Sequence, residues 1–157
     1  SVDNMRKYMM KLTQGFLMAC TLCICSMPSA WAQNDFAQTA AKEPGAKVSS
    51  SGLVFRSLQD GQGASPMATD KVKVHYRGTF PDGKEFDSSY KRNQAIEFPL
   101  NGVIPCWTEG VQLMKIGGKA KLTCPPAIAY GARGAGGVIP PNATLQFEVE
   151  LIAIAGK

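Results

Sequence analysis

Aromatic side chains are the residues of this 157-residue chain most able to form a binding site. They fall on most of the elements expected from the sequence: Tyr76, Phe86, Phe98, Trp107, Tyr130 and Phe147. Such rings could simply fill a hydrophobic core. A small domain does not need so many rings in one core, however, and an apolar cavity lined by rings is a usual binding-site pattern. We therefore expect an aromatic pocket that accepts an apolar group.

Side chains for covalent or metal-assisted catalysis are scarce. His75 is the only histidine, and it lies on the polar side of its expected strand, which favours a surface residue over a base or a metal ligand. The sequence contains no Ser/His/Asp set, zinc-binding motif or phosphate-binding loop. We expect neither a metal nor a cofactor, so chemistry in the pocket has to rely on contacts and hydrogen bonds.

The C-terminal part of the chain supplies a candidate pocket wall. A glycine-rich loop over residues 131–137 leads to an apolar tip at 138–141 and then to residues 145–151, where apolar and polar side chains alternate. Alternation with a period of two indicates a half-buried strand. An exposed apolar loop beside such a strand is typical of a binding-pocket wall.

The same alternation predicts about five strands in all, near residues 53–55, 71–77, 96–100, 119–124 and 145–154. A helix is expected where Trp107, Val111 and Met114 share one helical face, with Pro105 suited to its first turn. No strand–helix–strand rhythm occurs and the connections are short, which favours antiparallel pairing. We predict an α+β fold in which a single antiparallel sheet packs against one short helix.

The first 32 residues have the composition of a cleaved secretory signal: a basic start, a mostly apolar stretch over 16–27, and small residues at Ala30 and Ala32. The apolar stretch is too short and interrupted to span a bilayer, so stable membrane insertion is not expected. We predict a periplasmic or secreted bacterial protein. A buried helix of the domain is one alternative, and lipid anchoring at Cys20 is another.

Residues 33–51 are mostly small or polar, which predicts a flexible linker before a domain over 52–157. The net charge of the chain is +5, but no dense basic patch with interleaved aromatic residues is present, so nucleic acid is not an expected partner. Nothing in the sequence favours an oligomer, and a monomer is expected.

Cysteine usage agrees with export. Three of the five cysteines fall within the expected signal, which leaves Cys106 and Cys124 in the domain. An even pair in an oxidising compartment predicts one disulfide bond between them. A bond closing a loop of that length stabilises a fold by roughly 3 kcal/mol when it is unstrained.

Several short motifs occur in a fixed order along residues 52–157. They are Val-His-Tyr-Arg-Gly-Thr at 74–79, Asp-Gly-Lys-Glu-Phe-Asp-Ser-Ser at 82–89, Val-Ile at 103–104 with Trp-Thr-Glu-Gly at 107–110, Gly-Gly-Lys-Ala at 117–120, and Ala-Tyr-Gly at 129–131 leading to Ile-Pro-Pro-Asn-Ala-Thr-Leu at 139–145. In this order the motifs resemble those of the FKBP-type peptidyl-prolyl cis-trans isomerases.

The resemblance implies a curved antiparallel sheet wrapped around the short helix, with the pocket between them. It implies catalytic roles for Tyr76, Phe86, Asp87, Tyr130 and Phe147. Substrate-binding roles are implied for Phe98, Val103, Ile104, Trp107 and Ile139. In this scheme Trp107 forms the floor, and the backbone N–H of Ile104 and the hydroxyl of Tyr130 donate hydrogen bonds to the substrate.

The implied activity is rotation about X–Pro peptide bonds in exported proteins, which assists their folding. The barrier to this rotation is about 18–20 kcal/mol because the amide is conjugated, and no bond breaks during it. The implied partners are unfolded or proline-containing polypeptides, and macrolide inhibitors. A non-catalytic peptide-binding chaperone module that uses the same pocket is the alternative.

Overall fold

The computed structural model describes residues 30–157, with side chains described from residue 36 onward. The expected signal and the possible lipid-anchoring site at Cys20 therefore lie outside the described residues, apart from 30–32. None of the described helices is long and apolar enough to cross a membrane.

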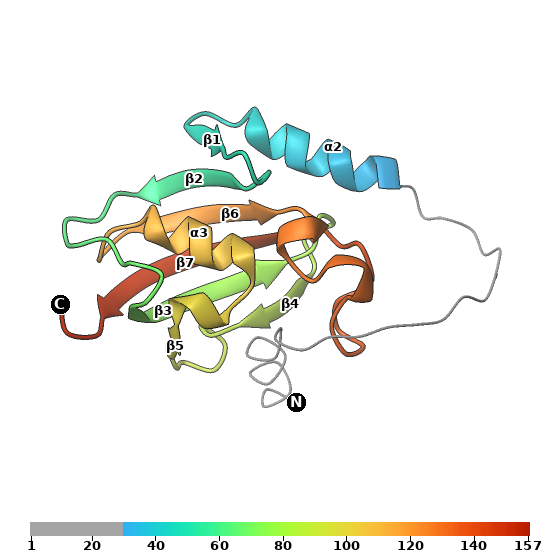
Figure 1. The fold of residues 1–157 in the computed structure, drawn as a ribbon. Helices are drawn as coiled ribbons and strands as arrows, with labels where there is room; N and C mark the ends of the chain where they lie inside the picture. Colours follow the sequence, from blue (N-terminus) through green and yellow to red (C-terminus); the bar gives the residue numbers. More distant parts are fainter. Residues whose placement is uncertain (1–29) are drawn as a thin grey trace.

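One antiparallel sheet organises the described chain (Figure 1), with strand order β1-β2-β6-β7-β3-β4 and β5 also paired to β3. The strands are β1 (Ala46–Val48), β2 (Val54–Gln59), β3 (Lys71–Thr79), β4 (Glu85–Ser88), β5 (Ile96–Pro99), β6 (Lys119–Cys124) and β7 (Leu145–Ile154). The α-helices are α2 (Ala30–Ala41) and α3 (Pro105–Gln112), and the 3-10 turns are η1 (Leu100–Gly102), η2 (Pro126–Ile128) and η3 (Gly131–Arg133).

The core lies between α3 and the face of the sheet that it crosses (Figure 1). Alternate residues of β3 and β7 point into it, as their alternating burial shows. Gly110 lets the helix approach the sheet closely, because a side-chain Cβ there would lie 2.8 Å from a methyl group of Leu122. Each large apolar side chain buried in this way contributes about 1.5–3 kcal/mol. The predicted α+β fold, a curved antiparallel sheet around one short helix, is confirmed.

The sheet has seven strands in place of the expected five. The additional strands are β1 and β4, which have three and four residues. Neither shows an alternation of buried and exposed residues, whereas the equally short β5 does, with Phe98 buried between exposed neighbours.

Residues expected to form a flexible linker take regular structure instead. α2 extends to Ala41, and β1 pairs with β2. Glu43, between them, accepts a hydrogen bond of 2.7 Å from Arg56 and lies 3.4 Å from the ammonium of Lys121. The reason is that alanine is the best helix former and needs little space, so a segment poor in large apolar residues can still pack. Ala40 illustrates this, because it is buried.

Candidate functional site

Five aromatic rings meet at the first turn of α3, and we refer to Tyr76, Phe86, Phe98, Trp107 and Phe147 as the aromatic cage. The indole of Trp107 lies at its centre, with ring centroids 5.2 Å from Tyr76, 5.4 Å from Phe98 and 5.3 Å from Phe147. Phe86 joins through Phe147, at 5.6 Å. Most of these pairs are edge-to-face, the arrangement that aromatic quadrupoles favour.

The sheet register brings these rings together from strands far apart in the sequence. Gly78 on β3 stands opposite Phe147 on β7, and Tyr76 stands two residues away on the same face. Glycine is required at position 78, because a Cβ there would lie 2.5 Å from the ring of Phe86 and 3.0 Å from that of Phe147. The missing side chain therefore makes the space in which Phe86 packs.

Trp107 is completely buried, and its ring nitrogen has no hydrogen-bond partner in the part of the chain that the structure describes. A buried donor without an acceptor costs about 1–3 kcal/mol. Ring packing around Trp107 must offset that cost, which indicates that this side chain is selected for its apolar surface.

A polar network borders the cage. The Tyr76 hydroxyl donates to the carboxylate of Asp87, which also accepts a 2.6 Å hydrogen bond from Arg92. A second nitrogen of Arg92 lies 3.2 Å from the Tyr76 hydroxyl oxygen, and the guanidinium lies 5.9 Å from the Tyr76 ring centroid. One arginine thus orients both the carboxylate and the ring.

Ionisation in this network follows from burial and pairing. Burial, and then the bond to Asp87, hold the pKa of Tyr76 well above its ordinary value. Burial alone would lower the pKa of Arg92, but its hydrogen bonds to Asp87 and Tyr76 outweigh that effect and raise it. Tyr76 therefore stays protonated and Arg92 stays charged at any physiological pH.

Sequence reasoning did not find Arg92. It stands in an irregular loop beside Lys91, whose ammonium pairs with Glu85 at 2.7 Å. The sequence does not distinguish two adjacent basic residues in a loop. The geometry of the turn decides that Arg92, and not Lys91, pairs with Asp87.

Two hydrogen-bond donors near the cage lack acceptors within residues 30–157. The carbonyl of Ile104 accepts bonds from the Trp107 and Thr108 backbone at 3.0 and 3.2 Å, but its own N–H donates none to the described residues. The Tyr130 hydroxyl likewise makes no hydrogen bond to the described side chains. Burial, and then the charge of Asp87, raise the pKa of Tyr130 to about 12, so its hydroxyl remains a donor.

A cavity of about 590 Å³ is lined by Tyr130 and by Val103 and Pro105 on either side of Ile104, while the five cage rings lie outside its lining. Its volume lies within the range of small-ligand sites. The structure thus places an apolar cavity, a free hydroxyl and the cage around the first turn of α3.

Backbone hydrogen bonds within the glycine-rich loop hold it in a compact conformation. Ala135 and Ile139 exchange hydrogen bonds of 2.9 and 3.0 Å, and the Asn142 N–H donates to Gly131 at 2.8 Å. Gly134 has a φ of +63°, and a Cβ there would lie 2.2 Å from the Ile139 carbonyl oxygen. Ile139 is buried in the core cluster, while the preceding Val138 is exposed.

A disulfide bond joins Cys106, in the first turn of α3, to Cys124 at the end of β6, with Cα atoms 5.8 Å apart. Both cysteines are buried. Since Cys106 directly precedes Trp107, the bond ties the floor of the cage to the sheet.

His75 lies outside the cage. It is half-buried, 2.8 Å from the Ser89 hydroxyl through Nδ1, and stacked on Tyr90 with ring centroids 4.8 Å apart. Among the residues that the structure describes, no group of three or more His, Cys, Asp or Glu side chains could hold a metal ion.

Comparisons with known proteins agree with this geometry. A family model described as FKBP-type peptidyl-prolyl cis-trans isomerase matches residues 63–152. The FKBP-type peptidyl-prolyl cis-trans isomerase FkpA of Escherichia coli (strain K12) is 51% identical over 120 residues, which cover 76% of this chain and 44% of the relative. The FKBP-type 22 kDa peptidyl-prolyl cis-trans isomerase of the same strain is 54% identical over 114 residues, covering 73% and 55%. The chain spans about half the length of these curated relatives.

Solved structures agree as well. The crystal structure of FkpA from Escherichia coli superposes with a TM-score of 0.76 at 49% identity, covering 78% of this chain and 57% of the other. A peptidyl-prolyl cis-trans isomerase from Pseudomonas syringae pv. tomato DC3000 superposes with a TM-score of 0.73 at 41% identity, covering 78% and 90%.

Proposed function

Since the chain belongs to the FKBP-type peptidyl-prolyl cis-trans isomerase family, we propose that its domain catalyses rotation about X–Pro peptide bonds in exported polypeptides. The observation that carries the proposal is the aromatic cage around Trp107 with two unpaired donors beside it, Ile104 N–H and the Tyr130 hydroxyl. The names of the relatives support the same activity.

The mechanism needs no covalent step. Uncatalysed exchange takes roughly 10–100 s. A turnover on the order of 10–1000 per second requires a barrier lower by about 3–6 kcal/mol. The apolar cage disfavours the planar amide, which is more dipolar than the twisted one, because it offers that amide no solvation. Hydrogen bonds from Ile104 and Tyr130 to the substrate carbonyls hold the twisted geometry and act most strongly in the transition state.

Asp87 acts in this scheme mainly through the groups that it holds. Its carboxylate accepts from Tyr76 and Arg92, so its charge is balanced and the Tyr76 ring is held against Trp107. The proposed contacts with the proline ring are those of Phe86, Phe98, Trp107, Ile139 and Phe147. Val103 and Tyr130 contact the preceding residue from the cavity wall.

An isomerisation assay on a proline-containing tetrapeptide tests the proposal. We expect Phe86→Ala and Asp87→Ala to lower kcat/KM by about tenfold or more, which corresponds to 1.4 kcal/mol or more of transition-state stabilisation. Lys73→Gln serves as the control, because Lys73 is exposed and lies on the opposite phase of β3 from Tyr76. A wild-type rate equal to the uncatalysed background would refute the proposal.

The competing function, a non-catalytic chaperone module, uses the same cage and predicts a different pattern. In that case suppression of aggregation of an unfolded protein falls in Phe86→Ala while no isomerisation is found in any variant. A macrolide that fills the cage gives a second discriminator, because it blocks isomerisation and aggregation suppression together only when both use the cage.

The proposed setting is the periplasm or the cell exterior, with the domain as a monomer after signal cleavage. The disulfide supports an oxidising compartment. Mass spectrometry of the exported protein tests the setting: a mature chain beginning at Gln33 supports cleavage after Ala32, whereas a lipid-modified Cys20 supports anchoring. Sedimentation of the same material tests the monomer.

A further inference from the structure

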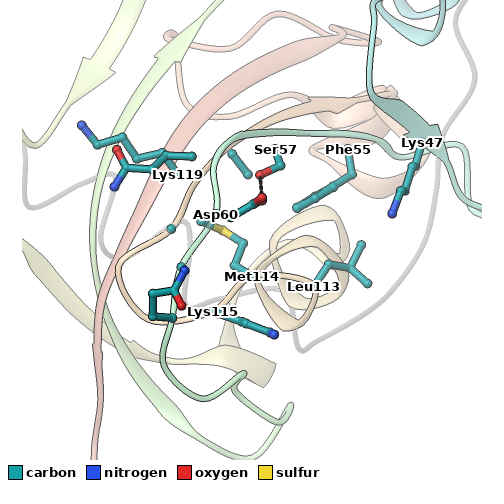
Figure 2. Close-up of a pocket in the computed structure, with 13 residues that line it drawn as sticks. Lys47, Phe55, Ser57, Asp60, Leu113, Met114, Lys115 and Lys119 are labelled. Carbon is teal, nitrogen blue, oxygen red and sulfur yellow. Dashed lines mark hydrogen bonds between the residues drawn. The ribbon is translucent and has the colours of Figure 1, made fainter.

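A second cavity lies at the opposite end of α3 from the cage. Its volume is about 420 Å³, and it is bounded by β2, the residues that follow α3, and the start of β6 (Figure 2). Its side chains come from Lys47, Phe55, Leu113, Met114 and Lys115 among others, and we call it the basic hollow.

Phe55, Leu113 and Met114 form an apolar floor in a lining that is otherwise mostly polar. Figure 2 shows Phe55 descending from β2 toward Met114 and Leu113. Leu113, which immediately follows α3, is 55% exposed. An exposed leucine beside a half-buried phenylalanine provides an anchor point for an apolar group.

Two cations on the rim have no carboxylate partner among the described residues, namely Lys47 on β1 and Lys115 after α3. In Figure 2 they flank Leu113. Lys119 extends to the far side of the hollow and pairs with Glu150 at 3.8 Å. Asp60 is the acidic residue in the lining, and it accepts a 2.7 Å hydrogen bond from Ser57. The lining thus holds three lysines against one carboxylate, so its net charge is positive.

The walls are fixed by backbone contacts. The N–H groups of Gln62 and Gly63 both donate to the Ile116 carbonyl at 3.2 Å, and the Gln59 side chain donates to Gly117 at 3.1 Å. Gly61 has no room for a side chain, since a Cβ would lie 2.4 Å from the Lys115 carbonyl oxygen. A cavity held this way is preformed, which reduces the entropy that a ligand must offset.

We propose that the basic hollow is a second binding site, which takes an acidic, apolar segment of an extended polypeptide. An apolar side chain of that segment rests on Leu113 and Phe55, and carboxylates on either side of it reach Lys47 and Lys115. A small inorganic anion would leave the apolar floor uncovered, whereas an acidic peptide complements both the charge and the floor. The cavity volume is within the range of specific ligand sites.

If the cage isomerises prolines as proposed, the position of the hollow allows a bound polypeptide to reach the cage. α3 has eight residues, so it is about 12 Å long at 1.5 Å per residue. Trp107 lies in its first turn and Leu113 just beyond its end. A client held in the hollow would present its nearby prolines to the cage at an effective concentration of about millimolar order.

A proline-free peptide tests the binding site without reference to isomerisation. The probe is a fluorescein-labelled decapeptide in which glutamate alternates with leucine and phenylalanine, and its binding is followed by fluorescence anisotropy. We expect Lys47→Gln/Lys115→Gln to weaken binding about three- to tenfold at low salt, and the difference to shrink at high salt. Leu113→Ser should weaken binding at both salt concentrations, because it removes an apolar contact.

The matched control is Lys73→Gln/Lys84→Gln, which removes the same charge from two exposed lysines outside the hollow. Equal loss in this control would overturn the proposal, as would equal binding of a peptide with lysine in place of glutamate. Displacement of the probe by a proline-containing tetrapeptide would assign the binding to the cage instead.

A linked substrate then tests the consequence. The acidic decapeptide is joined by a Gly/Ser linker to a proline-containing tetrapeptide, and kcat/KM is compared with that of the unlinked tetrapeptide. We expect a gain of about tenfold or more for the linked peptide, abolished by Lys47→Gln/Lys115→Gln. No turnover of the unlinked tetrapeptide refutes the proposed function and leaves the anisotropy result standing. Turnover without a gain on linking refutes the tethering.

Discussion

The first turn of α3 packs Trp107 among the rings of the aromatic cage, whereas its last turn leads to Leu113 in the solvent-exposed basic hollow. At the first end the charged groups are paired with one another, as in Arg92 with Asp87. At the second end Lys47 and Lys115 have no carboxylate partners among the described residues. The same short helix therefore borders one site whose charged groups are paired with each other and another whose exposed lysines have no carboxylate partner among the described residues.

Function and stability are coupled differently in the two regions. In the cage the groups proposed to bind substrate also hold the domain together, so a substitution there changes both. In the hollow three of the four proposed ligand contacts, Lys47, Leu113 and Lys115, come from exposed side chains, and only Phe55 packs against the core. Substitutions of those three should change binding while leaving the free energy of unfolding almost unaltered.

The largest expected effect comes from removing a cage ring. Phe147 is 1% exposed, and Phe147→Ala should lower the free energy of unfolding by about 3–5 kcal/mol. Leu113→Ala should change it by less than about 0.5 kcal/mol, because that side chain is mostly in solvent. Urea denaturation followed by tryptophan fluorescence measures both. Similar losses in the two variants would show that the hollow is part of the core.

The disulfide gives the next largest effect, and it acts on the cage end only. The double change Cys106→Ala/Cys124→Ala removes a bond that closes a loop over 18 positions, and should cost roughly 3 kcal/mol. Urea midpoints of the wild type with and without reductant provide a second measure. Binding of the acidic decapeptide to the folded double variant should be unchanged. A parallel loss of peptide binding would mean that the two ends of α3 are mechanically coupled.

Removing the cation of the cage network should have an intermediate effect. Arg92→Leu leaves the Asp87 carboxylate, whose side chain is only 11% exposed, without its cation. We expect a loss of about 1–3 kcal/mol in the free energy of unfolding, together with a lower kcat/KM. Arg92→Lys should restore the charge but only part of the activity, because a single ammonium does not reproduce the two-nitrogen contact with Asp87 and Tyr76.

Lys115→Leu is the matched change at the other end, since it removes an unpaired cation. It should leave stability and tetrapeptide turnover within error of the wild type. If Arg92→Leu behaved in the same way, the pairing around Asp87 would contribute nothing to the cage.

The sequence could indicate the rings that meet in the cage because Tyr76, Phe98 and Phe147 occupy alternating positions of strands, and Trp107 lies on the apolar face of the expected helix. Tyr76 and Phe147 each stand two residues from other buried side chains of their own strand. That spacing can be recognised in each strand's sequence separately. Arg92 and the basic hollow could not be found in this way. Arg92 comes from an irregular loop. The hollow depends on the pairing of β1 with β2, which sets Lys47 opposite Phe55, and on the hydrogen bonds from Gln62 and Gly63 to Ile116, next to Lys115. No local sequence pattern encodes either contact.

The helix and the strand within residues 33–51 were not expected, for a related reason. Composition alone measures how much apolar surface a segment can bury by itself, and residues 33–51 have little. Lys47 and its neighbours gain their structure from the edge of β2, and Glu43 gains two cationic partners from β2 and β6. Partners so distant in the sequence are invisible until the sheet is assembled.

The smallest expected effect within the ordinary working range is that of pH on the cage. Burial and the charge of Asp87 raise the pKa of Tyr130 to about 12, above its ordinary value near 10. Turnover of the tetrapeptide should therefore be flat between about pH 6 and 9 as far as this hydroxyl is concerned, because it stays protonated. The protonated hydroxyl contributes stability that is complete below about pH 10 and is lost as the pH rises toward 12. Tyr130→Phe should remove that part of the alkaline loss, measured as the difference in urea midpoint between the two proteins across this range. A tyrosinate absorbance titration measures the pKa of Tyr130 directly. Ionisation near pH 10 would show that its hydroxyl is as well solvated as the lysines of the basic hollow. The two ends of α3 would then differ in the burial of their aromatic rings but not in the solvation of their polar groups.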